Sequence, residues 1–103
     1  MGKKSSIKSI VRIVANISIH KILIKYGNKP EPINHLTSEI STYRDTALLN
    51  AQEFNWNKED KLEIEEDSIK IFKKEISRRY PDVKFQMPDA ERIIIQTIEE
   101  VIG

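Results

Sequence analysis

Three side chains spaced four residues apart are the first candidates for chemistry. Glu31, His35 and Glu39 fall in one row if a helix begins near Pro32. An imidazole nitrogen and carboxylate oxygens are ligands that Zn²⁺ or Mn²⁺ accepts. The row is therefore a candidate metal site. The alternative is a solvated helix face with ordinary side-chain pairing. We favour this alternative and expect no cofactor, because no second histidine or acidic cluster accompanies the row.

Other catalytic arrangements are not found in the sequence. The chain has no cysteine, which excludes a cysteine nucleophile and a thiolate zinc site. Its serines follow no glycine elbow, and its three glycines are too isolated to form a phosphate-binding loop. His20 and His35 have no recognisable Ser or Asp partner. We therefore expect a protein that is not an enzyme.

Basic residues are concentrated at the N-terminal end of the chain. Residues 1–30 contain seven Lys and Arg and no acidic residue, whereas residues 31–103 contain ten basic and sixteen acidic residues. This split indicates either contact with an anionic surface or folding of the basic segment against the acidic remainder. We favour folding within the chain, which satisfies both halves. A nucleic-acid-binding or targeting role for the segment stays open.

A nucleic-acid interface is the alternative functional hypothesis. Its cations lie in the first thirty residues and on the third predicted helix, where phosphate contacts would need only positive charge. The candidates are Lys21, Lys25, Lys29, Lys70, Lys73, Lys74, Arg78 and Arg79. Basic residues at the end of a helix also complement its dipole, which is the structural explanation for the second group.

Apolar spacing predicts a mainly α fold, a small four-helix, bundle-like single domain. Asn57 is placed to cap the third helix, with Asp60 completing a capping box. Residues 1–6 are expected to be a mobile basic N-terminus. The predicted helices lie near residues 5–26, 32–54, 58–80 and 89–102.

The first segment also permits a different fold. Ile and Val alternate along it and favour strands, so an α+β fold with strands near 10–26 and 83–87 is the alternative. In the helical fold, the apolar faces meet in one core. We expect that core to contain Ile33, Leu36, Ile40, Phe54, Leu62, Ile69, Phe72, Ile76, Ile94 and Ile98.

The first segment is apolar on more than one face, which predicts surplus apolar surface. Such surface favours a protein partner or self-association, and a two-fold homodimer is the commonest form. The functional expectation is thus a non-catalytic protein-interaction or regulatory helical module.

The sequence predicts no transmembrane segment, because charged residues interrupt its longest apolar stretch. We expect no peripheral membrane contact. The absence of cysteine and of a secretory signal favours a cytoplasmic location.

Overall fold

A computed structural model describes residues 2–27 and 33–103, which form four α-helices and no strand. The mainly α, four-helix prediction is confirmed. Residues 10–26 are helical throughout, and residues 83–86 have no regular structure, so the alternative strands are wrong. The helices are α1 (Lys3–Tyr26), α2 (Ile33–Ala51), α3 (Lys58–Arg79) and α4 (Met87–Ile102).

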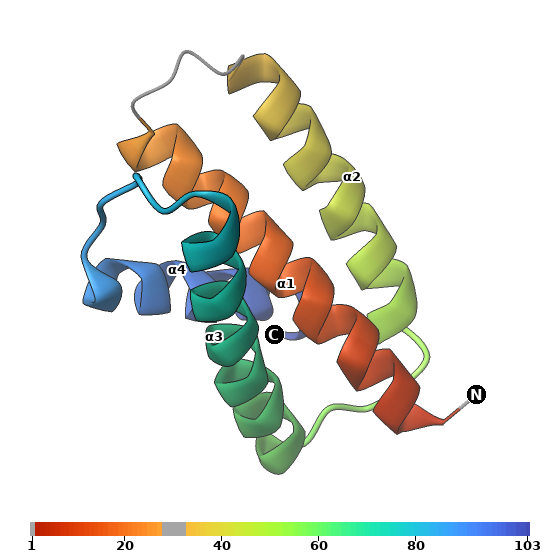
Figure 1. Cartoon of the computed structure of the whole chain (residues 1–103). Helices are drawn as coiled ribbons and strands as arrows, with labels where there is room; N and C mark the ends of the chain where they lie inside the picture. The colour runs from red at the N-terminus through yellow and green to blue at the C-terminus, as the bar shows by residue number, and fades with distance from the viewer. Residues whose placement is uncertain (1, 28–32) are drawn as a thin grey trace.

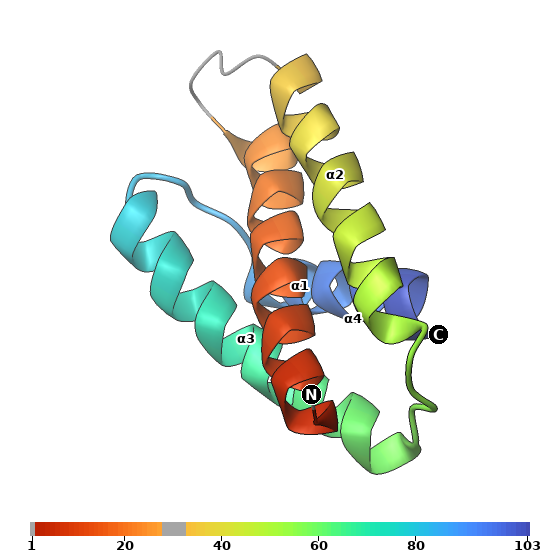
Figure 2. The same cartoon turned by 90° about the vertical axis from the view of Figure 1, so that its right-hand side faces the viewer.

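α1 is the central helix of the fold. α2 packs along one side of it and α3 along the other, while α4 crosses α1 on a third side (Figures 1 and 2). α4 also contacts both flanking helices, but α2 and α3 do not contact each other within the described residues. One broad face of α1, opposite α4, is left without a helix packed on it (Figure 1).

Most apolar residues of α1 are buried inside the chain, and Ile24 is its one large aliphatic residue that is exposed. Together with residues of the other three helices, the buried ones form one continuous core. This corrects the expectation of surplus apolar surface on the first segment, which was the basis for predicting self-association. The α1 members of the core are Ile7, Ile10, Val11, Val14, Ala15, Ile19 and Ile22.

The predicted core is correct in part. Six of its residues are buried, but Leu62 is 50% exposed. The buried face of α3 runs through Ile64 and Phe72, and a residue two positions before Ile64 lies about 200° away around the helix. Phe54 and Ile69 are only partly buried. The side chain of Ile33 lies outside the described residues. The six confirmed members are Leu36, Ile40, Phe72, Ile76, Ile94 and Ile98.

Three helix boundaries differ from the prediction by two or three residues: α4 begins at Met87 rather than at residue 89, and the other two have identifiable reasons. α1 already begins at Lys3, so residues 3–6 are helical. The Lys3 ammonium is held by the carbonyl of Asn55 at 2.7 Å and by Asp60 at 2.5 Å. α2 ends at Ala51 rather than near residue 54, and the Trp56 indole N–H donates to the Ala51 carbonyl at 3.0 Å. That bond satisfies one of the carbonyls that a helix end leaves unpaired.

The capping box at the start of α3 forms as predicted. The Asn57 side chain accepts from the Asp60 backbone N–H at 2.8 Å, and the Asp60 carboxylate accepts from the Asn57 N–H. Replacing Asn57 with alanine should lower the free energy of unfolding by about 1 kcal/mol, because helical N–H groups lose their acceptor. Asn57→Gly should lower the free energy of unfolding by only about 0.3 kcal/mol. Urea denaturation of both variants measures the difference, and equal losses would contradict the capping role.

Candidate functional site

The row that the sequence singled out is only partly within the described residues. Glu31 lies outside them, so its predicted contribution to a metal site has no structural account. His35 and Glu39 are one turn apart on α2, and the His35 Nε2 atom is 2.9 Å from the Glu39 Oε1 atom. His35 is well exposed, whereas Glu39 is about one-third exposed. These two residues therefore form an ordinary ion pair or hydrogen bond along the helix.

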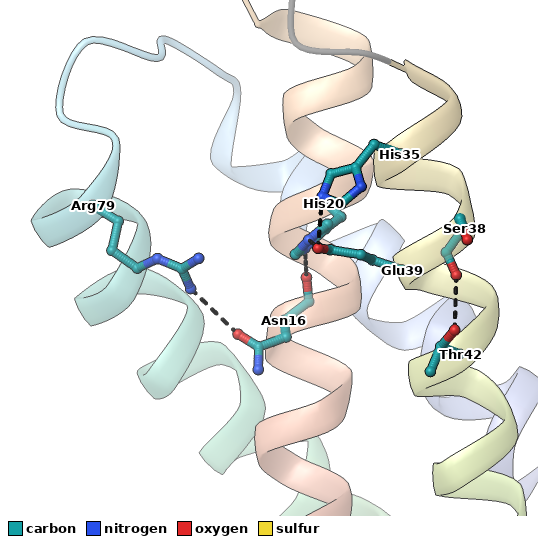
Figure 3. Close-up of polar contacts among 7 residues, drawn as sticks. All are labelled: Asn16, His20, His35, Ser38, Glu39, Thr42 and Arg79. Carbon is teal, nitrogen blue, oxygen red and sulfur yellow. Dashed lines mark hydrogen bonds and ion pairs between the residues drawn. The ribbon is translucent and has the colours of Figure 1, made fainter.

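The structure adds His20 of α1 to this pair. Its imidazole is 6% exposed, and its Nε2 atom contacts the Glu39 Oε2 atom across the α1–α2 interface. Its Nδ1 atom lies 2.7 Å from the carbonyl oxygen of Asn16. The ring also meets the edge of Tyr43 at a centroid distance of 5.8 Å. Figure 3 shows the two histidines converging on the Glu39 carboxylate.

His20 links two helices through its ring nitrogens. Both nitrogens face oxygen atoms, and the tautomer decides which of them carries the hydrogen that is donated. The hydrogen bond from His20 lowers the pKa of Glu39, against the opposing effect of partial burial.

Glu39 is the residue that joins the two histidines in this cluster. Among residues 2–27 and 33–103, no group of three or more His, Asp or Glu side chains is placed to hold a metal ion. Both oxygens of Glu39 already accept from histidine.

A second polar cluster joins the end of α1 to the start of α4. The Asp89 carboxylate is 8% exposed and accepts hydrogen bonds from Lys25 at 2.7 Å, from the Tyr26 hydroxyl and from Arg92. The hydrogen bond from Lys25, followed by those from Tyr26 and Arg92, holds the pKa of Asp89 well below its usual range. The same bond to Asp89 raises the pKa of Tyr26. Lys25 thus has a structural role.

Two more of the cations predicted to bind nucleic acid are held by acidic side chains. Lys21 donates to Thr97 at 2.9 Å and to Glu100 at 2.8 Å. Arg78 pairs with Glu75 at 2.6 Å. Arg79 contacts the Asn16 side chain at 3.5 Å, bridging α3 to α1 (Figure 3). Lys29 lies outside the described residues.

The other three cations predicted to bind nucleic acid lie on α3. Lys70, Lys73 and Lys74 are exposed on α3 and make no ion pair within the part of the chain that the structure describes. They are joined by two cations of α1 that the sequence did not single out. Lys8 and Arg12 are exposed one turn apart on α1, and both line a groove that Lys70 lines from α3.

This groove between α1 and α3 has a volume of about 410 Å³. Val11 and Ile71 supply apolar lining, and Asp67 is its one acidic residue. The spacing of Lys8 and Arg12 would have placed them on one face of a helix. The approach of Lys70 depends on the packing of α1 against α3, which no local pattern reveals.

No family model, curated protein or solved structure matches this chain. Within the described residues, no helix combines the length and apolar character needed to cross a membrane.

Proposed function

We propose that this protein is a non-catalytic interaction module that binds an acidic segment of a partner protein in the α1–α3 groove. The observation that carries the proposal is the groove itself, in which three cations surround an apolar lining. Lys8 and Arg12 lie on one wall and Lys70 on the other. No ion pair within the described residues occupies any of the three.

The lining favours a protein segment as the ligand. Val11 and Ile71 are apolar, so the groove suits an apolar anchor side chain with carboxylates on either side of it. An amphipathic helix laid between two helices makes contacts of this kind. A volume of about 410 Å³ accommodates a few side chains rather than a whole segment, so most of the partner would lie along the basic rim.

A non-catalytic role is supported by how the chemistry-bearing side chains are engaged. His20 is committed to Asn16 and Glu39, and Asp89 accepts from three donors. Neither group lies in the groove. A cytoplasmic location belongs to the same proposal and rests on the cysteine-free composition.

The proposal predicts that binding depends on the groove cations. Replacing Lys8, Arg12 and Lys70 together with alanine should weaken binding of a fluorescent amphipathic peptide rich in Glu and Leu by about tenfold, since each exposed charge contributes modestly. Fluorescence anisotropy at fixed ionic strength measures this. The matched control replaces three exposed lysines elsewhere: Lys58, Lys61 and Lys84. Equal weakening by the control would show general charge attraction and would contradict the groove.

Nucleic acid is the second candidate ligand, and the exposed row of Lys70, Lys73 and Lys74 favours it. Duplex binding should weaken steeply with salt, and each lysine that contacts a phosphate should account for about one unit of the salt slope. The Ile71→Ala variant separates the two ligands. It should weaken the peptide complex and leave binding to a short DNA duplex unchanged, because phosphates make no use of the apolar lining.

Self-association also stays a proposal, on a narrower basis. The large aliphatic side chains exposed in the described residues are Ile24, Leu49, Leu62 and Ile95, one on each helix. Scattered residues of this kind are common on monomers. Light scattering across a range of concentrations decides the oligomeric state.

A further inference from the structure

The two halves of α3 carry opposite charges. Residues 58–66 contain five acidic and two basic residues, whereas residues 70–79 contain five basic and one acidic residue. α3 packs against α1 and α4 at one edge of the fold, so its other side faces solvent (Figure 1). The dipole of a helix favours such charges mainly within its first and last turns. The charges in the middle of α3 therefore need another explanation.

The acidic half of α3 presents an apolar side chain between carboxylates. Leu62 is half exposed on this part of the helix. Glu59 and Glu66 lie about one turn before and after it, and Glu63 is its neighbour in sequence. All three glutamates are exposed, and none makes an ion pair with another described residue. These four residues, the acidic face of α3, have the chemistry that the α1–α3 groove requires of its ligand.

We propose that a second copy of this chain supplies the acidic segment that the groove binds, an inference that rests on the proposed function. Leu62 of one copy lies against Val11 and Ile71 in the groove of the next copy. The carboxylates of the acidic face then meet the three groove cations, Lys8, Arg12 and Lys70. Because the contact joins two different surfaces of the same chain, it is a head-to-tail contact.

The other exposed leucine fits the groove less well. Leu49 of α2 is 67% exposed and has Asp45 and Glu53 four residues before and after it. Two carboxylates match three cations less completely than three do, and Glu53 lies beyond the end of α2. The acidic face of α3 lies within one helix, whose start is fixed by its capping box. Its side chains are therefore already arranged for binding.

Sedimentation velocity over a range of protein concentrations tests the proposal. The wild-type chain should self-associate at low salt, and the association should weaken as salt screens the exposed charges. The groove variant replaces Lys8, Arg12 and Lys70 with alanine. The acidic-face variant combines Leu62→Ala, Glu63→Gln and Glu66→Gln, and keeps Glu59 because a carboxylate in the first turn stabilises a helix. Each variant should raise the dissociation constant of self-association by about tenfold or more, with an unchanged circular dichroism spectrum.

Mixing the two variants tests the pairing of the two surfaces. The groove variant keeps the acidic face and the acidic-face variant keeps the groove, so an equimolar mixture should form a one-to-one complex although neither variant associates alone. The matched control carries Asp45→Asn, Leu49→Ala and Glu53→Gln and should associate as the wild type does. A mixture that stays monomeric, or a control that loses its self-association, would overturn the proposal.

The amphipathic peptide rich in Glu and Leu separates this proposal from the proposed function. The peptide should dissociate the self-associated chain, because both ligands use the groove. A wild-type chain that binds the peptide but stays monomeric at every concentration would rule out the second copy as the ligand and would leave the groove as a site for another protein. A chain that neither binds the peptide nor self-associates would refute both.

Discussion

Replacing Phe72 with alanine should remove a large part of the stability of this fold. Phe72 is fully buried on α3 and meets Phe85 edge-on at a centroid distance of 5.5 Å. Truncating a buried phenylalanine loses its transfer free energy and leaves a cavity, at a cost of about 3–5 kcal/mol. Domains of this size have a free energy of unfolding of about 5–15 kcal/mol. Urea denaturation followed by circular dichroism should show the loss.

Leu62→Ala is the matched control on the same helix. Leu62 is half exposed and lies away from the buried face of α3, so its truncation should change the free energy of unfolding by less than about 0.5 kcal/mol. A loss comparable to that of Phe72→Ala would mean that α3 presents a different face to the core.

Asp89→Asn is expected to have the second largest effect. The variant keeps the size of the side chain but removes the charge that Lys25, Tyr26 and Arg92 all address. Lys25 and Arg92 are themselves more than half exposed, so water hydrates their charges in the variant, and the loss is that of the hydrogen bonds to the buried carboxylate. The melting temperature at neutral pH should fall by about 5 °C or more. Glu91→Gln is the control, because Glu91 carries the same charge on the same turn and makes no ion pair within the described residues.

The pH dependence of this effect has a definite sign. The pKa of Asp89 is depressed in the fold, chiefly by the hydrogen bond from Lys25. Its contribution is therefore fully present above the ordinary aspartate pKa of about 3.9 and is lost as the pH falls toward the depressed value. The melting curves of wild type and Asp89→Asn should stay apart at neutral pH and converge in strong acid. A difference that persists unchanged in acid would rule out the carboxylate charge as its cause.

The sequence predicts α3 and α4 well because each buries one face. Their stripes of Ile and Phe, with the Asn57–Asp60 box and the prolines, define both elements to within about two residues. The sequence predicts an end of α2 that is three residues too late, because Phe54 continues the apolar spacing. In the structure, Phe54 packs edge-on against Trp56 instead of continuing the helix.

α1 could not be assigned firmly for a physical reason. A helix that packs against three others is apolar around much of its circumference, so its periodicity fades and its alternating Ile and Val residues also fit a strand. For the same reason, the predicted core contains no residue of α1. It contains only residues of the three helices with clear apolar stripes, and the apolar residues of α1 are interpreted as surplus surface.

The polar clusters could not be predicted because their members are far apart in sequence. Lys21 and Glu100 are separated by 79 residues, and Lys25 and Asp89 by 64. Such pairs follow from the crossing of α1 and α4, which local spacing does not encode. The charge asymmetry does indicate that the basic segment folds against the acidic remainder. The two pairs above and the pair of Lys3 with Asp60 make this contact. Lys8 and Arg12 belong to the part of the basic segment that is exposed to solvent, as does Lys4.

The central position of α1 has a consequence for how the chain is made. α1 is the first of the four helices to be synthesised, yet its partners α3 and α4 follow only after more than thirty further residues. Until they emerge, its row of isoleucines and valines is exposed to solvent and to other chains. Contacts of such long sequence separation slow folding relative to a bundle of sequential neighbours. During that interval, the exposed apolar surface of α1 is the part of the chain most prone to aggregate.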